Sequence, residues 1–217
     1  MIRAIFFDLD GTLIDRAPLW LRCVDDFMRR HHLAFPGASR GAFLGDLSEV
    51  TDSPFLDRFL VARVVSRMFP ALGLTPEAIA ADLATRLPGF VEHDPAVVRL
   101  VRDLSGRYAT AIVTNGSRRV QRPKLDRAGL DGVVGRVYIS GEVGLRKPDP
   151  ALFRLALRRA GVAPGDALFV GDHPYEDILG GQRAGLLTCA VGTRYFDYWP
   201  EPDWKIDRVV DLPGVLG

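Results

Sequence analysis

The sequence is poor in cysteine and has no long apolar run. Its two cysteines, Cys23 and Cys189, lie far apart without the spacing of a metal site, so a disulfide scaffold and a zinc finger are excluded. We expect both thiols to be buried packing residues. No uninterrupted apolar stretch approaches the ~18 residues of a membrane-spanning helix. Because the chain begins directly in an apparent strand, without a leader pattern, we expect a cytoplasmic protein with no membrane partner.

The sequence also has little net charge and few lysines. Its 28 Lys and Arg residues against 27 Asp and Glu residues give a net charge of +1. This balance offers no attraction to nucleic acid or to an acidic membrane, so a small molecule is the expected partner. We expect a monomer or a homodimer. With 47% hydrophobic and 25% charged residues, the composition is that of an ordinary globular protein.

Two carboxylates follow the first apolar run of the chain. Residues 3–7 predict a buried parallel strand, and Asp8 and Asp10 come directly after it. In open α/β sheets, ligands bind beyond the carboxyl ends of such strands. The pair either shares a divalent cation or divides the roles of nucleophile and general acid/base. The alternative is an ordinary Asp-Gly turn.

Three more polar segments follow later apolar runs. Thr114-Asn115-Gly116 closes the run 109–113, and its hydroxyl and backbone N–H groups suit phosphoryl oxygens. Lys147 lies in a Lys-Pro-Asp-Pro segment. It is one of only three lysines in the chain, against 25 arginines. A compact ammonium fits between a carboxylate and a phosphoryl oxygen better than a guanidinium does. Gly171-Asp172 ends the run 167–170, and Glu176 and Asp177 follow. Lys124 is interpreted as a surface residue.

This set of motifs resembles the haloacid dehalogenase superfamily, and within it the phosphatases that carry a helical cap after the first strand. The resemblance implies a Mg²⁺-dependent phosphatase that hydrolyses a small phosphomonoester through an aspartyl-phosphate. It implies that Asp8 supplies the attacking oxygen and one metal ligand, the backbone carbonyl of Asp10 a second ligand, and Asp172 a third. The Asp10 side chain is then the general acid/base. Asp177 is favoured over Glu176 as the acid that lies outside the metal ligands or orients Lys147.

The pattern of the chain predicts an α/β fold. After about residue 93, helical periods alternate with short apolar strands, which is typical of a Rossmann-like parallel sheet with helices on both faces. Helices are expected at 95–105, 117–128, 149–160 and 174–184, and the last strands at 187–191 and 206–210. Residues 16–92 are helical only and predict an inserted four-helix cap. The catalytic core is therefore expected at 1–15 and 93–217.

Three other functions remain open at this stage. A 2-haloacid dehalogenase on the same scaffold has no use for Asp10 or Asp172, and a phosphomutase differs in how its cap excludes water. A receiver-like phosphorylatable switch, which is not an enzyme, lacks the long insertion after its first strand. The substrate stays open among phosphoglycolate, sugar phosphates and nucleoside monophosphates. Arg16, Trp20 and Arg40 are only possible cap contributors.

Overall fold

The computed structural model describes residues 1–33, 58–192 and 200–217. The chain divides into two units. One consists of Met1–Ile14 and His93–Gly217, and the other of Asp15–Glu92. Each unit is described by itself below. Arg40 lies outside the described residues.

A six-stranded parallel sheet forms the centre of the first unit. Its strands are β1 (Ala4–Phe7), β2 (Ala109–Thr114), β3 (Arg136–Ile139), β4 (Ala167–Gly171), β5 (Leu187–Val191) and β6 (Trp204–Ile206). Their order is β3-β2-β1-β4-β5-β6, and every neighbouring pair is parallel. This is the doubly wound order, in which the chain runs outward from β1 in both directions. The predicted Rossmann-like α/β fold is confirmed.

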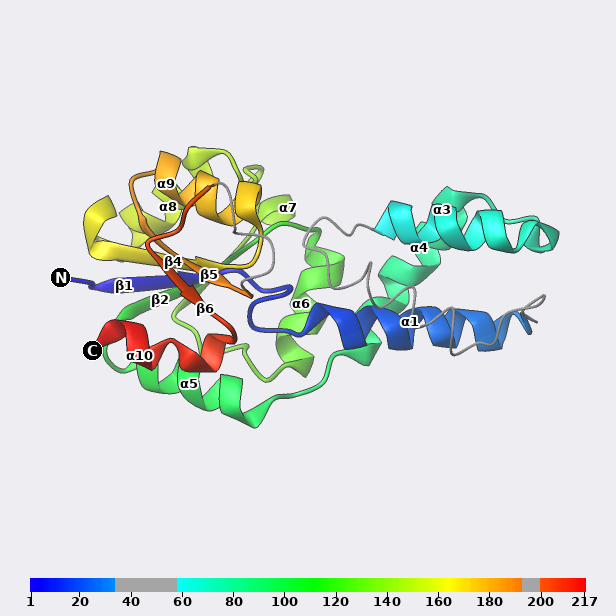
Figure 1. The fold of residues 1–217 in the computed structure, drawn as a ribbon, viewed down its shortest axis with the longest axis horizontal. Coiled ribbons are helices and arrows are strands. Elements are labelled where there is room, and N and C mark those ends of the chain that lie inside the picture. Colours follow the sequence, from blue (N-terminus) through cyan, green and yellow to red (C-terminus); the bar gives the residue numbers. More distant parts are fainter. Residues whose placement is uncertain (34–57, 193–199) are drawn as a thin grey trace. The chain divides into compact units, whose positions relative to one another are not determined.

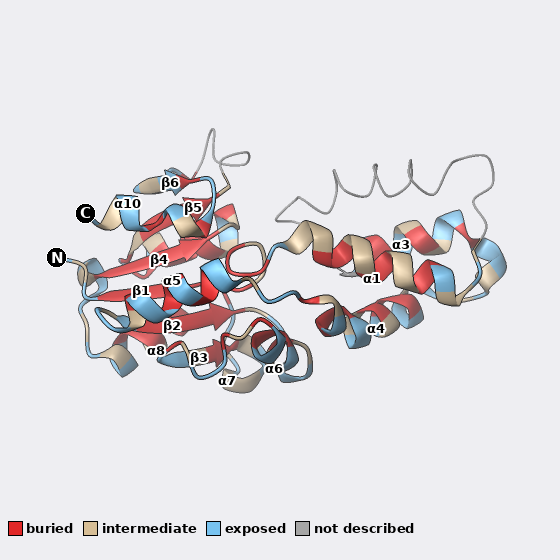
Figure 2. Ribbon diagram, turned by 90° about the horizontal axis from the view of Figure 1, so that it is seen from below, coloured by how far each residue is buried: buried red, intermediate tan, exposed pale blue. Residues whose placement is uncertain are grey.

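Helices cover both faces of this sheet, and both faces are therefore buried. In Figure 1, α8 (Pro150–Ala160) and α9 (Gly180–Arg183) lie on one side, and α5 (Pro95–Ser105) and α10 (Pro213–Leu216) lie on the other. Phe6, Phe153 and Phe169 pack in the core on the α8 side, with the rings of Phe153 and Phe169 edge to face at 4.9 Å. Figure 2 shows β1, β2 and β4 buried along their lengths. This is why these strands are continuous apolar runs in the sequence.

Helix boundaries in this unit follow local capping chemistry. Asp94 caps α5 by accepting from the N–H groups of Ala96 and Val97, and Asp149 caps α8 in the same way through Ala151. Pro95 and Pro150 occupy the first helical position, where a missing N–H costs nothing. α6 (Arg118–Arg127) and the short α7 (Ser140–Val143) complete the unit. The helices expected at 95–105, 117–128 and 149–160 are confirmed to within one residue at each end.

The prediction of the last strand was wrong. This strand is Trp204–Ile206 rather than 206–210, because Trp204–Ile206 pairs with Cys189–Val191 of β5. Val209–Asp211 instead forms a 3₁₀ turn, in which Asp211 accepts from the N–H of Arg208. The helix expected at 174–184 is confirmed to within one residue: it begins as a π-helical turn, Pro174–Leu179, and continues into α9, which ends at Arg183.

In its described residues, the second unit contains helices and turns but no strand. It contains α1 (Arg16–Arg30), α3 (Arg58–Met68) and α4 (Pro76–Arg86), with 3₁₀ turns at Pro70–Leu72 and Leu87–Phe90. α1 buries one stripe that includes Leu19, Trp20, Cys23 and Phe27, so Trp20 is a packing residue. Its polar face carries ion pairs to α4. Residues 34–57 lie outside the described residues, so the expected count of four helices stays a prediction.

Candidate active site

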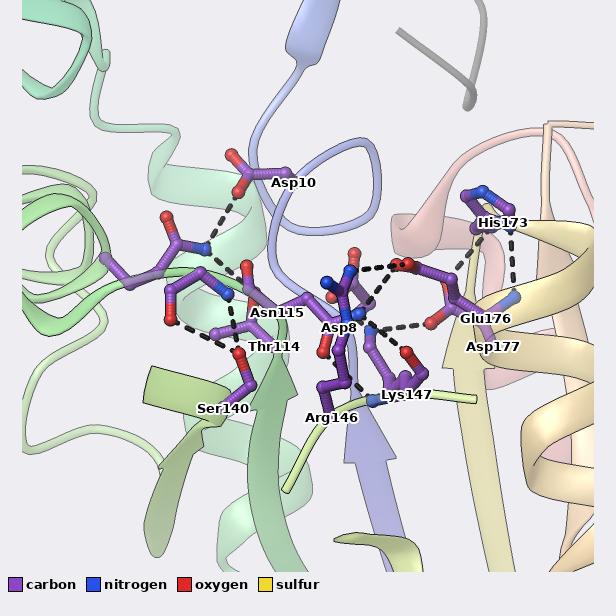
Figure 3. A network of polar contacts seen from close by, with 12 residues as sticks. Asp8, Asp10, Thr114, Asn115, Ser140, Arg146, Lys147, His173, Glu176 and Asp177 are labelled. Atoms are coloured by element: carbon purple, nitrogen blue, oxygen red, sulfur yellow. Dashed lines mark hydrogen bonds and ion pairs between the residues drawn. The ribbon is translucent and has the colours of Figure 1, made fainter. Parts of the chain in front are cut away.

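The predicted site residues follow the ends of three adjacent strands. Asp8 comes directly after β1, Thr114 is the last residue of β2, and Asp172 follows β4. β1 pairs with both β2 and β4, with Phe7 opposite Ile112 and Val170. The carboxyl ends of parallel neighbours meet at one edge of the sheet, where Figure 3 shows Asp8 and Thr114 and where an oxygen of Asp172 lies within 4.8 Å of one of Asp8.

Lys147 lies between two carboxylates at this edge. Its Nζ donates to Oδ1 of Asp8 and to Oδ1 of Asp177, each at 2.6 Å. The Lys147 side chain is 2% exposed and that of Asp177 is fully buried. Burial alone lowers the pKa of Lys147, but the charges of Asp177 and Asp8 outweigh this and raise the pKa above its ordinary value. The ammonium therefore stays charged and holds the Asp8 oxygen in a fixed direction.

Asp8 is held in an environment that penalises its charge. Desolvation by burial raises the pKa of Asp8 to about 6, against the lowering effect of Lys147 and with a further raising effect of Asp177. A buried carboxylate of this kind, beside a single cation, is a frequent sign of a functional site. A second cation close to Asp8 would relieve the excess negative charge.

Asp177 is fixed by its loop as well as by Lys147. Its Oδ2 accepts from the N–H of His173 at 3.0 Å, and Nδ1 of His173 accepts from the N–H groups of Tyr175 and Glu176. Gly171 makes room for this arrangement, because a Cβ at that position would lie 2.4 Å from Oδ2 of Asp177. The contacts of His173 are thus those of a loop residue that caps the π-helical turn.

Asn115 clamps the backbone of Lys147. Its Oδ1 accepts from the N–H of Lys147, and its Nδ2 donates to the carbonyl of Lys147, both at 3.0 Å. The same Nδ2 donates to Oε2 of Glu176 at 2.8 Å, and Oε1 of Glu176 accepts from Arg146 at 3.2 Å. The two acidic residues of this loop therefore differ in their contacts. Asp177 contacts the Lys147 ammonium, and Glu176 contacts the Asn115 amide that holds the Lys147 backbone.

Ser140, which belongs to none of the predicted motifs, forms hydrogen bonds with the backbone of Gly116. The N–H of Gly116 donates to Oγ of Ser140 at 2.9 Å, and the same Oγ lies 3.3 Å from the carbonyl oxygen of Gly116. Ser140 is the first residue of α7, directly after β3. This contact ties the segment after β2 to the segment after β3.

Asp10 lies apart from the Asp8, Lys147 and Asp177 cluster and contacts α6 (Figure 3). Its Oδ1 accepts from Nζ of Lys124 at 2.7 Å, and its Oδ2 accepts from Nε2 of Gln121 at 2.9 Å. The interpretation of Lys124 as a surface residue was therefore wrong. Its side chain is only 5% exposed, because its helix face turns toward the loop after β1 rather than toward solvent.

Three carboxylates come close enough to bind one metal ion. One oxygen each of Asp8, Asp172 and Asp177 lies within 4.8 Å of the other two. Hard carboxylate oxygens are the ligands that Mg²⁺ prefers. Both oxygens of Asp177 already accept from Lys147 and His173, so Asp8 and Asp172 are the better candidates for direct ligands. The donor set therefore fits the metal that the sequence predicts.

Comparison with known proteins identifies the family. Residues 2–185 match the haloacid dehalogenase-like hydrolases. The chain belongs to this family. A glyceraldehyde 3-phosphate phosphatase of Methanopyrus kandleri is 30% identical over an alignment of 233 positions, which covers 100% of this chain and 97% of that relative. A phosphoserine phosphatase of Thermus thermophilus is 47% identical over 100 residues, which cover 45% of this chain and 40% of that relative. The prediction of a hydrolase of this superfamily is confirmed, and both relatives agree with a phosphoric monoester hydrolase.

Solved structures agree with the fold of this hydrolase. A HAD-hydrolase of Bacillus subtilis, determined with bound magnesium, superposes with a TM-score of 0.79 at 21% identity and covers 100% of this chain and 99% of that chain. A 2-haloacid dehalogenase of Pseudomonas syringae superposes at 0.62 with 27% identity and covers 100% of this chain and 98% of that chain. The chain therefore shares its scaffold with a protein named as a dehalogenase as well as with the phosphatase relatives, and the side chains must separate the two activities. In the described residues, no helix is long and apolar enough to span a membrane.

Sequence reasoning missed four polar residues of this hydrolase's site. They are Gln121, Lys124, Ser140 and Arg146. For the first two a signal exists: Gln121 and Lys124 are three residues apart on one predicted helix face, shortly after Thr114-Asn115-Gly116. Ser140 follows a predicted strand end, as the other site residues do. No pattern singles out Arg146.

Proposed function

We propose that this hydrolase is a Mg²⁺-dependent phosphatase that hydrolyses a small phosphomonoester through a phosphorylated aspartate. The observation that carries the proposal is the position of Lys147, whose Nζ contacts Asp8 and Asp177 in a carboxylate cluster that also includes Asp172. A buried cation beside a carboxylate nucleophile is what attack on a phosphate dianion requires.

Asp8 is assigned as the nucleophile. Its carboxylate oxygen attacks phosphorus, and the bond between phosphorus and the ester oxygen breaks. Lys147 restricts the rotation of the Asp8 carboxylate and offers its charge to a phosphoryl oxygen. The Thr114 hydroxyl and the segment of Asn115 and Gly116 face the same edge of the sheet, where they would hold the remaining phosphoryl oxygens.

Asp10 is assigned as the general acid and then the general base. Its carboxylic acid gives a proton to the leaving alkoxide. Its carboxylate then takes a proton from the water that attacks the phosphoryl group on Asp8, which breaks the bond to Asp8 and releases inorganic phosphate. The proton balance closes over one turnover, since the water supplies the proton that Asp10 gave to the alcohol.

The residues that would hold Mg²⁺ are Asp8, Asp172 and the backbone carbonyl of Asp10, with Asp177 outside them. When bound there, the ion supplies positive charge that offsets the repulsion between the phosphate dianion and the Asp8 carboxylate. Asp177 and Glu176 are assigned to hold other side chains rather than to bind the ion. Asp177 holds Lys147, and Glu176 holds Asn115.

The unit Asp15–Glu92 is assigned as a cap over the catalytic unit of 1–14 and 93–217. Its insertion directly after the site-bearing loop of β1 supports this assignment. A cap would exclude water during phosphorylation and admit it afterwards. The location in the cytoplasm and the monomeric or dimeric state stay predictions of the sequence.

A phosphate-release screen tests the proposed function. The purified protein is incubated with Mg²⁺ and a panel that includes glyceraldehyde 3-phosphate, phosphoserine, phosphoglycolate, sugar phosphates and nucleoside monophosphates. We expect catalytic release from at least one ester, its loss after chelation with EDTA, and its return with Mg²⁺. Asp8→Asn is the matched control.

The same preparation is offered 2-chloropropionate. Halide release that survives EDTA, with no phosphate release from any ester, would replace the proposal with a dehalogenase. A single phosphoryl group taken up per molecule, without turnover, would indicate a phosphorylatable switch.

A further inference from the structure

The carboxylate of Asp10 is held by two buried side chains of one helix. Lys124 and Gln121 in α6 each engage a different oxygen of Asp10, at 2.7 and 2.9 Å. They lie three residues apart and therefore on one face of the helix. Gln121 is 1% exposed and Lys124 is 4% exposed. Burying an amide and an ammonium is costly unless each is paired, and in both cases Asp10 is a partner.

The amide of Gln121 also joins Asp10 to the predicted phosphate site. Its Nε2 donates to Oγ1 of Thr114 at 2.8 Å as well as to Asp10. The hydroxyl of Thr114 accepts this hydrogen bond and is left to donate its own proton. That proton faces the carbonyl of Asn115 at 3.4 Å, a long contact that a phosphoryl oxygen can replace.

Gly116 provides the space for this contact. A Cβ at Gly116 would lie 2.8 Å from Cγ of Gln121 and 3.0 Å from its Cδ, and the φ of Gly116 is +147°. The Gln121 side chain therefore lies directly against the backbone after β2. A glycine is needed at position 116 for a reason other than a turn. Because it has no side chain, Gln121 can reach both Thr114 and Asp10.

We propose that Gln121 and Lys124 are positioning residues that set the direction of the Asp10 carboxyl group and couple it to the Thr114 hydroxyl. This inference rests on the proposed function, in which Asp10 protonates the leaving group. One donor on each oxygen fixes the rotation of the carboxyl group about its Cβ–Cγ bond. Because both donors come from α6, a shift of this helix moves the proton donor and the phosphate contact together.

A positioning role makes a specific kinetic prediction. An alkyl ester leaves as a basic alkoxide and needs a proton from Asp10, whereas nitrophenolate leaves without one. Lys124→Met and Gln121→Met should lower the single-turnover rate of phosphorylation by about tenfold or more for an alkyl phosphate and by only about twofold for nitrophenyl phosphate. KM for both esters should change little.

The matched control is Arg119→Met, which removes a cation from an exposed position of the same helix. It should leave both rates unchanged. Melting temperatures show whether each variant folds, and Gln121→Met carries the test if Lys124→Met does not fold. The Asp10→Asn variant removes the proton donor itself, so its selective loss of rate on alkyl esters is the upper limit for the other variants.

The outcomes separate the two proposals. A selective loss on alkyl esters supports the positioning role. Equal losses on both esters in folded variants, or no loss on either, would overturn that role while wild-type turnover upholds the phosphatase. If the wild-type protein releases phosphate from neither ester and from no member of the substrate panel, the proposed function fails, and the positioning role fails with it.

Discussion

The ion pairs of α1 and α4 in one unit and the Lys147 cluster in the other place their charges in opposite environments. In the unit Asp15–Glu92, Arg30, Asp26, Asp82 and Arg86 pair along the faces of α1 and α4 with side chains that are 23–46% exposed. In the other unit, Lys147 and Asp177 are at most 2% exposed, and Asp8 is 10% exposed. Surface pairs contribute little to stability, and buried pairs have a large desolvation cost.

This difference shows where charge serves chemistry. The α1 and α4 pairs lie between helices that also bury apolar stripes, so we expect the pairs to contribute little to stability. The buried cluster has no such explanation, because apolar residues of similar size would fill the same space at lower cost. Its cost is offset only if the cluster does something that apolar residues cannot do. The predictions below compare the two units directly.

The largest expected effect is on turnover. Asp8→Asn should lower kcat by more than about 10⁴-fold, because an amide is a poor nucleophile. Folding should not suffer, since the change removes a buried charge that burial penalises. Asp26→Asn in α1 is the matched change in the other unit, and it should keep near wild-type turnover. Steady-state kinetics and melting curves measure both. Substantial activity in Asp8→Asn would remove Asp8 as the nucleophile.

The second effect is on stability. Lys147→Met leaves Asp8 and Asp177 buried side by side without their cation, and this should lower the free energy of unfolding by about 3–5 kcal/mol. Arg30→Met, which breaks pairs with Asp26 and Asp82, should cost at most about 1 kcal/mol. Denaturant unfolding without added metal measures both changes. Similar costs for the two variants would show that the buried cluster is no different in kind from the surface pairs.

The sequence was sufficient for the features that depend on local pattern. Apolar runs located β1, β2, β4 and β5, and helical periods located α5, α6 and α8. The site residues at the strand ends were found because ligands bind beyond the carboxyl ends of parallel strands, and the end of an apolar run can be located in the sequence. Lys124 was misjudged because burial depends on which way a helix face turns, and a one-dimensional pattern does not report that. The β6 boundary failed because this strand is short, Trp204–Ile206, and has an exposed lysine at its centre, so it is not an apolar run.

A third effect concerns the metal. Asp172→Asn should raise the Mg²⁺ concentration needed for half-maximal activity by at least about tenfold, because it weakens a direct ligand. Asp177→Asn should instead lower stability and kcat with a smaller change in Mg²⁺ requirement, since both Asp177 oxygens hold Lys147 and His173. Magnesium titrations of activity distinguish the two. The reverse pattern would exchange the roles of the two aspartates.

The smallest effect concerns the cysteines, which are buried in both units as the sequence predicts. Burial raises the pKa of Cys189 from its ordinary value of 9.0 to about 12. The unfolded chain therefore loses this proton at lower pH than the folded protein does, so the contribution to stability is present below pH 9 and is lost as the pH rises toward 12. The free energy of unfolding of Cys189→Ala should fall less steeply over this range than that of the wild type. Equal slopes would contradict the raised pKa.

Gly171 has a consequence for how this site can be lost. The carboxylate of Asp177 occupies the volume where a Cβ would stand. A single added methyl group would therefore displace Asp177, release Lys147 and remove the contact that holds Asp8, although every charged residue of the site would still be present. A gene copy with alanine at this position would keep all the acidic and basic motif residues, and we expect the protein that it encodes to be inactive. Inheritance of this activity thus depends on a missing side chain as strictly as on any functional group.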